Sequence, residues 1–229
     1  MARPKGHGPQ YEVRRREVIR AAARLFAERG FGGTSLDDLC AAVGLGKGAL
    51  YHYIGSKEEL LLQIQAAVVK PLILRARTIL ALPASAVARL RLVSELLLRS
   101  IVAEHDLVVV YEHEQTHLHG ARRDRFVADR GAFEHLVLDL IGQCVSEGSF
   151  KLDDPHLAML EFLNLHNHTY QWVDPGGPWT APFLSQHYCA VLFVGFGISR
   201  PRLRVVEREA ARLLATHDLD LPEVCLAPT

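Results

Sequence analysis

Apolar residues recur at the spacing of an α-helix along almost the whole chain, and no sustained stretch alternates apolar and polar residues as a half-buried strand does. Val18, Ala21, Ala22, Leu25 and Phe26 show this pattern, because residues three, four and seven positions apart share one face of a helix. A chain of 229 residues is also long enough to bury a substantial core. The sequence therefore predicts an all-α fold.

Glycine- and proline-containing segments divide the chain into about nine or ten predicted helices. The expected breaks lie near residues 30–33, 44–46, 55, 83, 120, 148–155, 174–180 and 201. The first helix is expected from about Tyr11 to Arg29, and Ser56 followed by Glu59 predicts a capping box at the start of the fourth. Residues 1–10 are rich in Gly, Pro and basic side chains, so we expect a disordered basic arm there.

Positive charge is concentrated at the N-terminal end. The whole chain carries 26 basic and 26 acidic residues, which argues against a protein that coats nucleic acid or membrane along its full surface. Residues 1–57, however, hold ten Lys or Arg against five acids. This excess predicts that the N-terminal quarter meets an anionic polymer, although a solvated basic tail would have the same composition.

The four cysteines are widely spaced and form no Cys-x-x-Cys pair, so we expect reduced core thiols at Cys40, Cys144, Cys189 and Cys225. No apolar stretch follows the N-terminal charges, which argues against a secretory signal. The longest apolar run, residues 188–198, is too short to span a bilayer. We therefore expect a cytoplasmic protein without a membrane partner.

The segment from Thr34 to Tyr53 predicts two short helices joined by a tight turn. Leu36 and Leu39 give the first helix an inward-facing stripe. Gly44 permits a left-handed turn, and Leu50 fills the angle between the helices. This arrangement is typical of a helix-turn-helix, whose second helix enters the major groove of DNA.

The second of these helices carries small residues beside hydrogen-bond donors. Gly46, Gly48 and Ala49 would let it approach a duplex closely, while Lys47 and Tyr51 would supply donors for phosphates and base edges. The preceding helix N-terminus would hold a backbone phosphate. The candidate DNA-contacting residues are Thr34, Ser35, Gly46, Lys47, Ala49, Tyr51, His52 and Lys57.

The stretch Thr34–Lys57, together with Phe26 and Gly30, resembles the DNA-binding signature of the tetracycline-repressor (TetR) family of bacterial regulators. The resemblance covers roughly residues 12–62, and departs from the family at Ile54, where Phe is usual, and at Gly46, where Ser or Thr is common. It implies a homodimer whose recognition helices enter successive major grooves of a palindromic double-stranded DNA operator. It also implies binding chemistry rather than catalysis, with no cofactor and a small-molecule effector.

The resemblance implies a helix-turn-helix domain over residues 11–57 and an α-helical effector-binding and dimerisation domain over residues 58–229. The helix expected from Phe183 to Gly197 is apolar nearly all round and must be covered on several sides. With the helix expected over residues 155–172, it would form the four-helix dimer bundle of the family. Burial within one subunit is the alternative.

Aromatic side chains with polar neighbours mark candidate effector contacts, since a ligand cavity in a helical bundle requires both, although most such residues are simply core. The segment Tyr170–Trp172 followed by Asp174–Gly177 is similar to a stretch of family members that respond to acyl-coenzyme A thioesters. This similarity suggests a repressor of lipid or acyl-CoA catabolism. The candidate effector contacts are Tyr111, His113, Phe133, His168 and Trp172.

One segment matches a different chemistry: His113-Glu114-Gln115-Thr116-His117 fits the H-E-x-x-H pattern of zinc peptidases. Two imidazoles one helical turn apart can bind Zn²⁺, and Glu114 would serve as base. The longer metzincin pattern requires a third histidine where this chain has Arg123. A zinc metallohydrolase and a helical interaction protein are therefore alternatives, and His113 and His117 are candidate metal ligands, effector contacts or ordinary polar residues.

Overall fold

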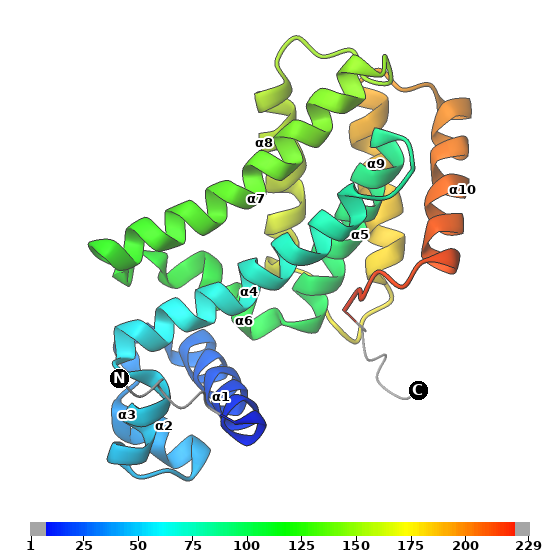
Figure 1. Ribbon diagram of the computed structural model, residues 1–229. Helices are drawn as coiled ribbons and strands as arrows, with labels where there is room; N and C mark the ends of the chain where they lie inside the picture. Colours follow the sequence, from blue (N-terminus) through cyan, green and yellow to red (C-terminus); the bar gives the residue numbers. More distant parts are fainter. Residues whose placement is uncertain (1–7, 223–229) are drawn as a thin grey trace, which may run out of the picture. The chain divides into compact units, whose positions relative to one another are not determined.

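A computed structural model describes residues 8–222 of the chain, and these residues form ten α-helices, two short 3₁₀ helices and no strand (Figure 1). The predicted all-α class is therefore confirmed. The elements are α1 (Pro9–Gly33), α2 (Leu36–Val43), α3 (Lys47–Ile54), α4 (Lys57–Leu80), α5 (Ala86–Ala103), α6 (His105–His113), η1 (Glu114–His117), α7 (Ala121–Ser146), α8 (Pro155–Asn167), η2 (His168–Gln171), α9 (Ala181–Gly195) and α10 (Arg200–Thr216).

The described residues form two compact units. The first comprises residues 8–68 and 106–127, and the second comprises residues 69–105 and 128–222. The first unit thus contains α1 to α3 together with the first part of α4, most of α6, η1 and the first turns of α7. This folded unit is larger than the DNA-binding segment expected over residues 11–57.

Helix α1 begins two residues earlier than expected. Pro9 occupies its first turn, where a proline loses no intrahelical hydrogen bond, so Pro9 and Gln10 belong to the helix rather than to an arm. The rest of the expected arm, residues 1–7, lies outside the described residues. Near its C-terminal end the helix is interrupted at Gly30, whose φ of 76° and ψ of 159° are not helical. This break matches the one expected at residues 30–33.

The core of the second unit is built around α5, which contacts α8, α9, α10 and η2. From Ala86 to Leu98 of α5, every residue except Arg89 is buried. Two caps hold its first turn, because the Ser85 hydroxyl accepts from the Ala88 amide and the Glu209 carboxylate of α10 accepts from the Ser85 amide. The sequence did not single out α5 as the central helix.

Helix α9, by contrast, buries only one face. Leu184, Tyr188 and Phe193 are buried, whereas Val191 is 58% exposed and Val194 is 40% exposed. The expectation that this helix is covered on several sides is therefore not met within one chain. No helix in the described part of the chain is long and apolar enough to cross a membrane.

The thiols of Cys40, Cys144 and Cys189 are free, and Cys225 lies outside the described residues. Burial raises the pKa of Cys189 to about 12, and burial also raises the pKa of Cys144 well above its usual range. A thiol that stays protonated is a poor nucleophile. The two buried cysteines therefore act as core residues, as expected.

Candidate functional site

Helices α2 and α3 are joined by the tight turn that the sequence predicts. Ser35 caps α2 in a reciprocal capping box with Asp38, because the serine hydroxyl accepts from the Asp38 amide (3.1 Å) and the Asp38 carboxylate accepts from the Ser35 amide (2.8 Å). The Ser35 hydroxyl also donates to that carboxylate (2.5 Å), and this bond together with the one from the Ser35 amide, aided by the Arg29 charge, holds the pKa of Asp38 below its ordinary value. Gly44 ends the helix in the left-handed region, with φ 65° and ψ 35°, which a residue with a Cβ adopts only at a cost.

Thr34 lies just before the start of α2, where Ser35 is the N-cap. Its side chain is buried, and its hydroxyl lies 3.0 Å from the Gly30 carbonyl oxygen and 3.3 Å from that of Leu25. The hydroxyl therefore makes its contacts with the backbone of α1 at the break. The Thr34 side chain thus makes a structural contact in this structure, Ser35 is the exposed residue at that helix start, and a phosphate contact by Thr34 stays a prediction.

Lys57 is likewise turned inward rather than outward. Its ammonium donates to the Phe31 carbonyl and lies 4.2 Å from the centre of the Phe31 ring, a cation–π contact. Burial lowers the pKa of Lys57, although the carboxylates of Glu58 and Glu114 oppose that effect. In this structure Lys57 joins the start of α4 to the end of α1, and its DNA contact stays a prediction.

The remaining candidates lie on one exposed surface of α3. Lys47, Ala49, Tyr51 and His52 are exposed, with 43% of Tyr51 accessible, while Leu50 and Ile54 face the core. Gly46 is the N-cap of α3, and a Cβ at Gly46 or Gly48 would meet no atom within 4 Å. The helix therefore presents donors beside a shallow, unobstructed flank, the shape that lets a helix approach a DNA groove.

The sequence analysis missed two residues of α1 that hold α3 and the turn in place. Tyr11 stacks on Tyr53 with ring centres 4.9 Å apart, and its hydroxyl donates to the His52 carbonyl (3.2 Å). Arg14 donates to the Val43 carbonyl at the C-terminal end of α2. These contacts join residues 29 to 42 positions apart, and helical spacing along one segment gives no signal for such pairs.

Lys47 is held by an acidic residue on the same surface. Its ammonium lies 2.9 Å from the Asp37 carboxylate, and this contact raises the pKa of Lys47. Both side chains are exposed, at 60% and 74%. Asp37 therefore competes with any phosphate for Lys47 and places a negative charge next to the candidate DNA surface.

We predict that Asp37→Asn strengthens binding to specific duplex DNA about fivefold at low salt, because the competing carboxylate is removed from an exposed ion pair. The gain should shrink as salt rises, since salt screens exposed charges. Fluorescence anisotropy at two salt concentrations measures it. Asp139→Asn, an exposed acid in α7, should leave the affinity unchanged. Equal gains from both variants would show that only net charge matters.

The H-E-x-x-H segment does not lie on one continuous α-helix. Helix α6 ends at His113, and Glu114 to His117 form the 3₁₀ helix η1. The His117 imidazole lies 3.3 Å from the Glu114 carboxylate and packs on the Phe31 ring, with centres 4.9 Å apart. No group of three or more His, Cys, Asp or Glu in residues 8–222 is arranged to hold a metal ion. In this structure the segment therefore packs η1 against α1, through the contact of His117 with Phe31.

The candidate effector contacts fall in both units. In the first unit, Tyr111 is buried with its ring 5.4 Å from Phe126, and His113 is exposed. In the second unit, Phe133 is buried, whereas His168 and Trp172 are exposed. Trp172 meets Trp179 edge to face at 5.9 Å.

A further buried amide lies near Tyr111 and was not found from the sequence. Gln65 of α4 is 1% exposed, and its side-chain NH₂ donates to the Val110 carbonyl (3.3 Å). That bond sets the orientation of the amide, and its oxygen has no hydrogen-bond partner among the described residues. A buried acceptor of this kind is uncommon, which makes Gln65 a candidate for contact with a donor group.

The second unit contains a buried polar network that links α5 to α8, α9 and α10. Arg91 of α5 donates through Nε to both carboxylate oxygens of Glu207 (2.9 and 3.1 Å) and through Nη1 to Glu95 (3.1 Å). Arg99 donates to the other oxygen of Glu95 (2.7 Å). Two guanidinium groups thus balance two carboxylates, which is the condition for keeping charges in a core.

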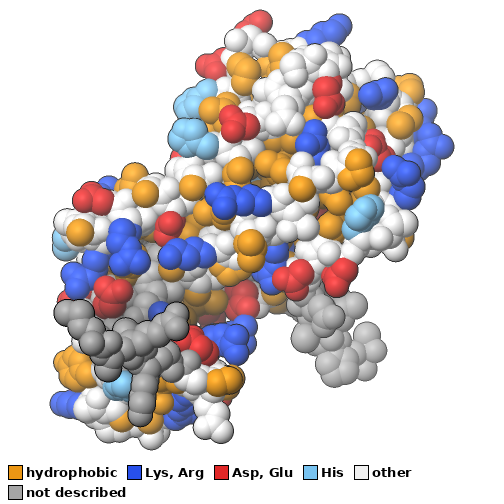
Figure 2. Space-filling model, viewed as in Figure 1, with side chains coloured by type: hydrophobic (Ala, Val, Ile, Leu, Met, Phe, Trp, Pro, Cys, Tyr) orange, Lys and Arg blue, Asp and Glu red, His pale blue; other side chains and the backbone are white. Residues whose placement is uncertain are grey.

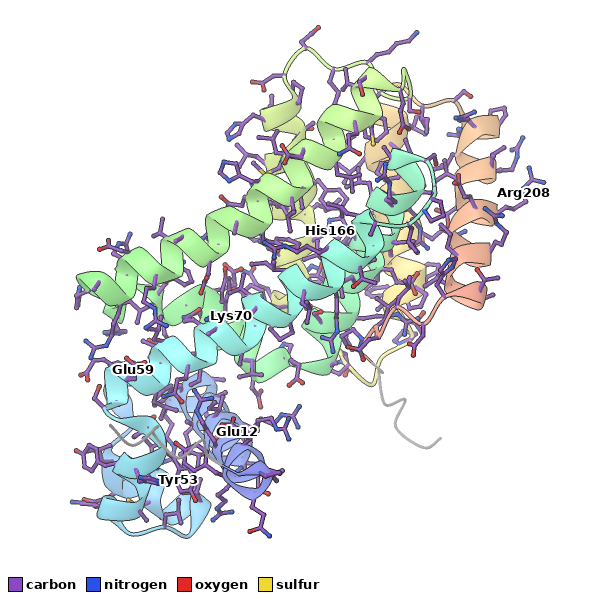
Figure 3. All side chains as sticks on the ribbon, in the orientation of Figure 1. Glu12, Tyr53, Glu59, Lys70, His166 and Arg208 are labelled. Atoms are coloured by element: carbon purple, nitrogen blue, oxygen red, sulfur yellow. The ribbon has the colours of Figure 1, made fainter. Side chains whose placement is uncertain are left out.

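A directed chain of hydrogen bonds runs from Arg91 to His166. Arg91 Nη1 donates to Ser185 (2.7 Å), whose hydroxyl donates to Ser94 (2.8 Å), and Ser94 lies 2.6 Å from His166 Nε2. His166 Nδ1 lies 2.6 Å from the Phe162 carbonyl, which can only accept, so Nδ1 carries the proton and Nε2 accepts. His166 is fully buried (Figure 3), and no local pattern in the sequence singles it out.

Burial lowers the pKa of His166 to about 4, with a contribution from the nearby Arg91 charge, while the Phe162 hydrogen bond opposes the shift. Because an unfolded histidine titrates near pH 6.5, the unfolded state takes up a proton first as the pH falls. We predict that this residue removes about 2 kcal/mol of stability between pH 6.5 and pH 5, and none above pH 7.

Urea unfolding at several pH values measures this loss. His166→Gln should flatten the dependence over that interval, whereas His168→Gln, an exposed histidine two positions away, should leave it unchanged. Equal slopes for the wild type and His166→Gln would contradict the assignment.

Comparison with known proteins identifies the family to which the chain is similar. Residues 18–64 match the model of bacterial regulatory proteins of the tetR family, and residues 83–196 match the model of the tetracyclin repressor-like C-terminal domain. Helix α10 lies beyond the second match. The chain is 31% identical over 188 residues to the HTH-type transcriptional repressor KstR2 of Mycobacterium tuberculosis H37Rv, covering 81% of this chain and 94% of the relative.

Solved structures agree. The regulator PfmR of Thermus thermophilus has 30% sequence identity and a TM-score of 0.74, covering 80% of this chain and 99% of PfmR. The regulator AibR, solved with isovaleryl coenzyme A and operator DNA, has 27% identity and a TM-score of 0.70, covering 79% of this chain and 98% of AibR. These findings favour neither a metallohydrolase nor a helical interaction protein. The chain belongs to the TetR family of bacterial transcription regulators.

Proposed function

We propose that this protein is a ligand-responsive repressor that binds a palindromic DNA operator through the exposed surface of α3. The observation that carries the proposal is the geometry of that helix, where Lys47, Tyr51 and His52 stand beside the unobstructed flank of Gly46 and Gly48. Helix α3 enters the major groove, and Ser35 contacts the phosphate backbone. The relatives are named as repressors, which supports repression rather than activation as the effect of operator binding. A regulator of chromosomal genes works in the cytoplasm.

The proposed homodimer is formed by the exposed apolar face of α8 and α9, which consists of Leu157, Leu160, Leu165, Val191 and Val194. Water-exposed aliphatic side chains gathered on two adjacent helices favour burial by a second copy, and a two-fold axis lets the same face serve both partners. Two recognition helices related by that axis match the two halves of a palindrome.

We predict that the double variant Val191→Glu/Val194→Glu is a monomer. Burying two carboxylates per subunit in an apolar interface without partners costs several kcal/mol, about 5 or more. Sedimentation should give a mass near 25.5 kDa for the variant and twice that for the wild type. Val205→Glu, an exposed valine of α10 outside this face, should stay dimeric. A wild-type monomer would refute the dimer.

The proposed effector is an acyl-coenzyme A thioester, and derepression is its proposed effect. The similarity of residues 170–177 to acyl-CoA-responsive members and the isovaleryl coenzyme A bound to AibR support this ligand class. Tyr111, His113, Phe133, His168 and Trp172 stay the predicted contacts, and within the first unit the oxygen of Gln65 is a further candidate acceptor. Within the first unit, α6 leads into η1, which packs on Phe31, so a shift of α6 is transmitted to the helices that hold α3.

A gel-shift titration on the DNA upstream of the protein's own gene, with and without a panel of short, long and steroid-like acyl-CoA thioesters, tests the proposal. A specific, salt-sensitive shift that one thioester reverses is expected. A specific shift that no thioester changes would keep the operator and overturn the ligand class. The absence of any specific shift would overturn the regulator itself.

A further inference from the structure

Helices α8, α9 and α10 of the second unit lie next to one another against α5, with α9 in the middle (Figure 1). Between α9 and α10 the surface is hollowed into a groove of about 740 Å³. Its α9 wall shares the exposed stripe of that helix with Val191 and Val194, which belong to the proposed dimer face. A second copy that covers this face therefore covers the groove as well. The residues that line the groove are Phe183, Gln186, His187, Ala190, Leu203, Arg204, Glu207 and Arg208.

The proposed dimer face contains one carboxylate near the middle of α8. Glu161 is exposed and lies four residues from both Leu157 and Leu165, so it shares their side of the helix. It is the only acidic residue of α8, and it forms no ion pair with the basic side chains of residues 8–222. Burying a carboxylate against apolar side chains costs free energy unless a cation is buried with it. The partner subunit must therefore supply a positive charge at this point.

The cations nearest to the dimer face belong to α10. Neither α8 nor α9 contains a lysine or arginine, whereas Arg204 and Arg208 stand in the α10 wall of the groove. Both are exposed, and neither forms an ion pair with a carboxylate of the described residues. The acid in the same wall, Glu207, is bound by the buried Arg91 in the core network. Arginine side chains gather along α10 in the space-filling view, and Arg208 projects outward from the helix (Figures 2 and 3).

The order of the three helices brings these charges together across a two-fold axis. In a dimer bundle of two α8 and two α9 helices, each α8 packs on the partner's α9. Because α10 borders α9, the partner's α8 then lies along the groove, and its row of side chains enters between the two helices. Phe183 favours this packing, since it is 51% exposed in one chain and its side chain gains free energy from burial.

From these observations we infer that the α9–α10 groove receives α8 of a second copy of this chain, and that Arg204 and Arg208 pair there with the partner's Glu161. The inference rests on the proposed dimer and adds a third helix and an ion pair to its interface. The two-fold axis forms the contact twice. Opposite charges enclosed by apolar contacts fix the register of the two surfaces, because a shifted arrangement leaves them unpaired.

Charge reversal tests the pairing in the full-length protein without DNA, by sedimentation over a range of protein concentrations. Glu161→Arg should raise the dimer dissociation constant at least about 100-fold, because it sets a third cation against Arg204 and Arg208 at both contacts. Arg204→Glu/Arg208→Glu should raise it by a similar factor. The triple variant Glu161→Arg/Arg204→Glu/Arg208→Glu exchanges the charges and should return the constant to within about tenfold of the wild type. That recovery would also show that the separate substitutions leave the fold intact.

Arg202→Glu/Arg212→Glu is the control, since it reverses two exposed cations of α10 that do not line the groove. Because salt screens distant charges, it should change the dissociation constant less than about threefold. Equal weakening by this variant would mean that only the net charge of α10 matters, which would overturn the contact.

The remaining outcomes separate the contact from the dimer itself. A wild-type protein that sediments as a monomer at every concentration would refute the dimer and this contact with it. A dimer that Glu161→Arg leaves intact would keep the proposed dimer and overturn the ion pair. A triple variant as dissociated as its parts would show that Glu161 and the two arginines do not meet.

Discussion

Lys47→Ala/Tyr51→Ala should lower the affinity for operator DNA at least about 100-fold while leaving the fold and the dimer intact. Each side chain that contacts a phosphate or base edge contributes about 1–3 kcal/mol, and a dimer loses both contacts twice. Both residues are exposed, so their removal creates no cavity. Anisotropy titrations at fixed salt measure the loss, because DNA affinities are comparable only at one salt concentration.

The matched control is Arg202→Ala/Trp179→Ala, which removes one exposed cation and one exposed aromatic residue in the second unit. This variant should bind operator as the wild type does. If Lys47→Ala/Tyr51→Ala retained more than a tenth of the wild-type affinity, α3 would not be the recognition helix.

Arg91→Ala should lower the free energy of unfolding by about 4 kcal/mol, because it leaves Glu207 and one oxygen of Glu95 without their buried partner. It also removes the donor that orients Ser185, and with it the chain that ends at His166. For a chain of this length, such a loss corresponds to a fall in Tm of about 10 °C. Differential scanning calorimetry at one protein concentration measures it.

Arg202→Ala, on the exposed side of α10, should change stability by less than about 0.5 kcal/mol. The loss of stability in Glu207→Gln should lie between those of Arg91→Ala and Arg202→Ala. The amide oxygen still accepts from Arg91, and Glu95 keeps both of its cations. If Arg91→Ala were as mild as Arg202→Ala, the network would be a consequence of the packing of α5 rather than a cause of it.

Local signals in the sequence were sufficient for the helix-turn-helix. Gly44 predicted a left-handed turn, and Ser56 with Glu59 predicted the start of α4, where the serine hydroxyl accepts from the Glu59 amide (3.0 Å). Each of these features depends on residues within one turn of each other. The inward positions of Thr34 and Lys57 depend instead on the end of α1, because their side chains donate to the Gly30 and Phe31 carbonyls there. No pattern within α2 or α4 reveals the geometry of that end.

The polar network of the second unit was not accessible from the sequence for a related reason. Arg91 and Glu207 are 116 residues apart, and Ser94 and His166 are 72 apart. An arginine in an otherwise apolar helix indicates either a solvent-exposed position or a buried ion pair, and only the tertiary fold decides between them. The roles of the candidate effector residues remain predictions for the same reason, because a ligand cavity is a property of the packed helices.

The central claim is that two copies of α3 recognise the two halves of a palindrome. Selection of bound duplexes from a random DNA library by the purified full-length protein, followed by sequencing, tests it with no operator sequence chosen beforehand. We expect one enriched motif with two inverted half-sites whose centres are about 10 base pairs apart, or a multiple of that spacing, and no enrichment by Lys47→Ala/Tyr51→Ala. A library that stays random, or a motif equally enriched by that variant, would contradict the account.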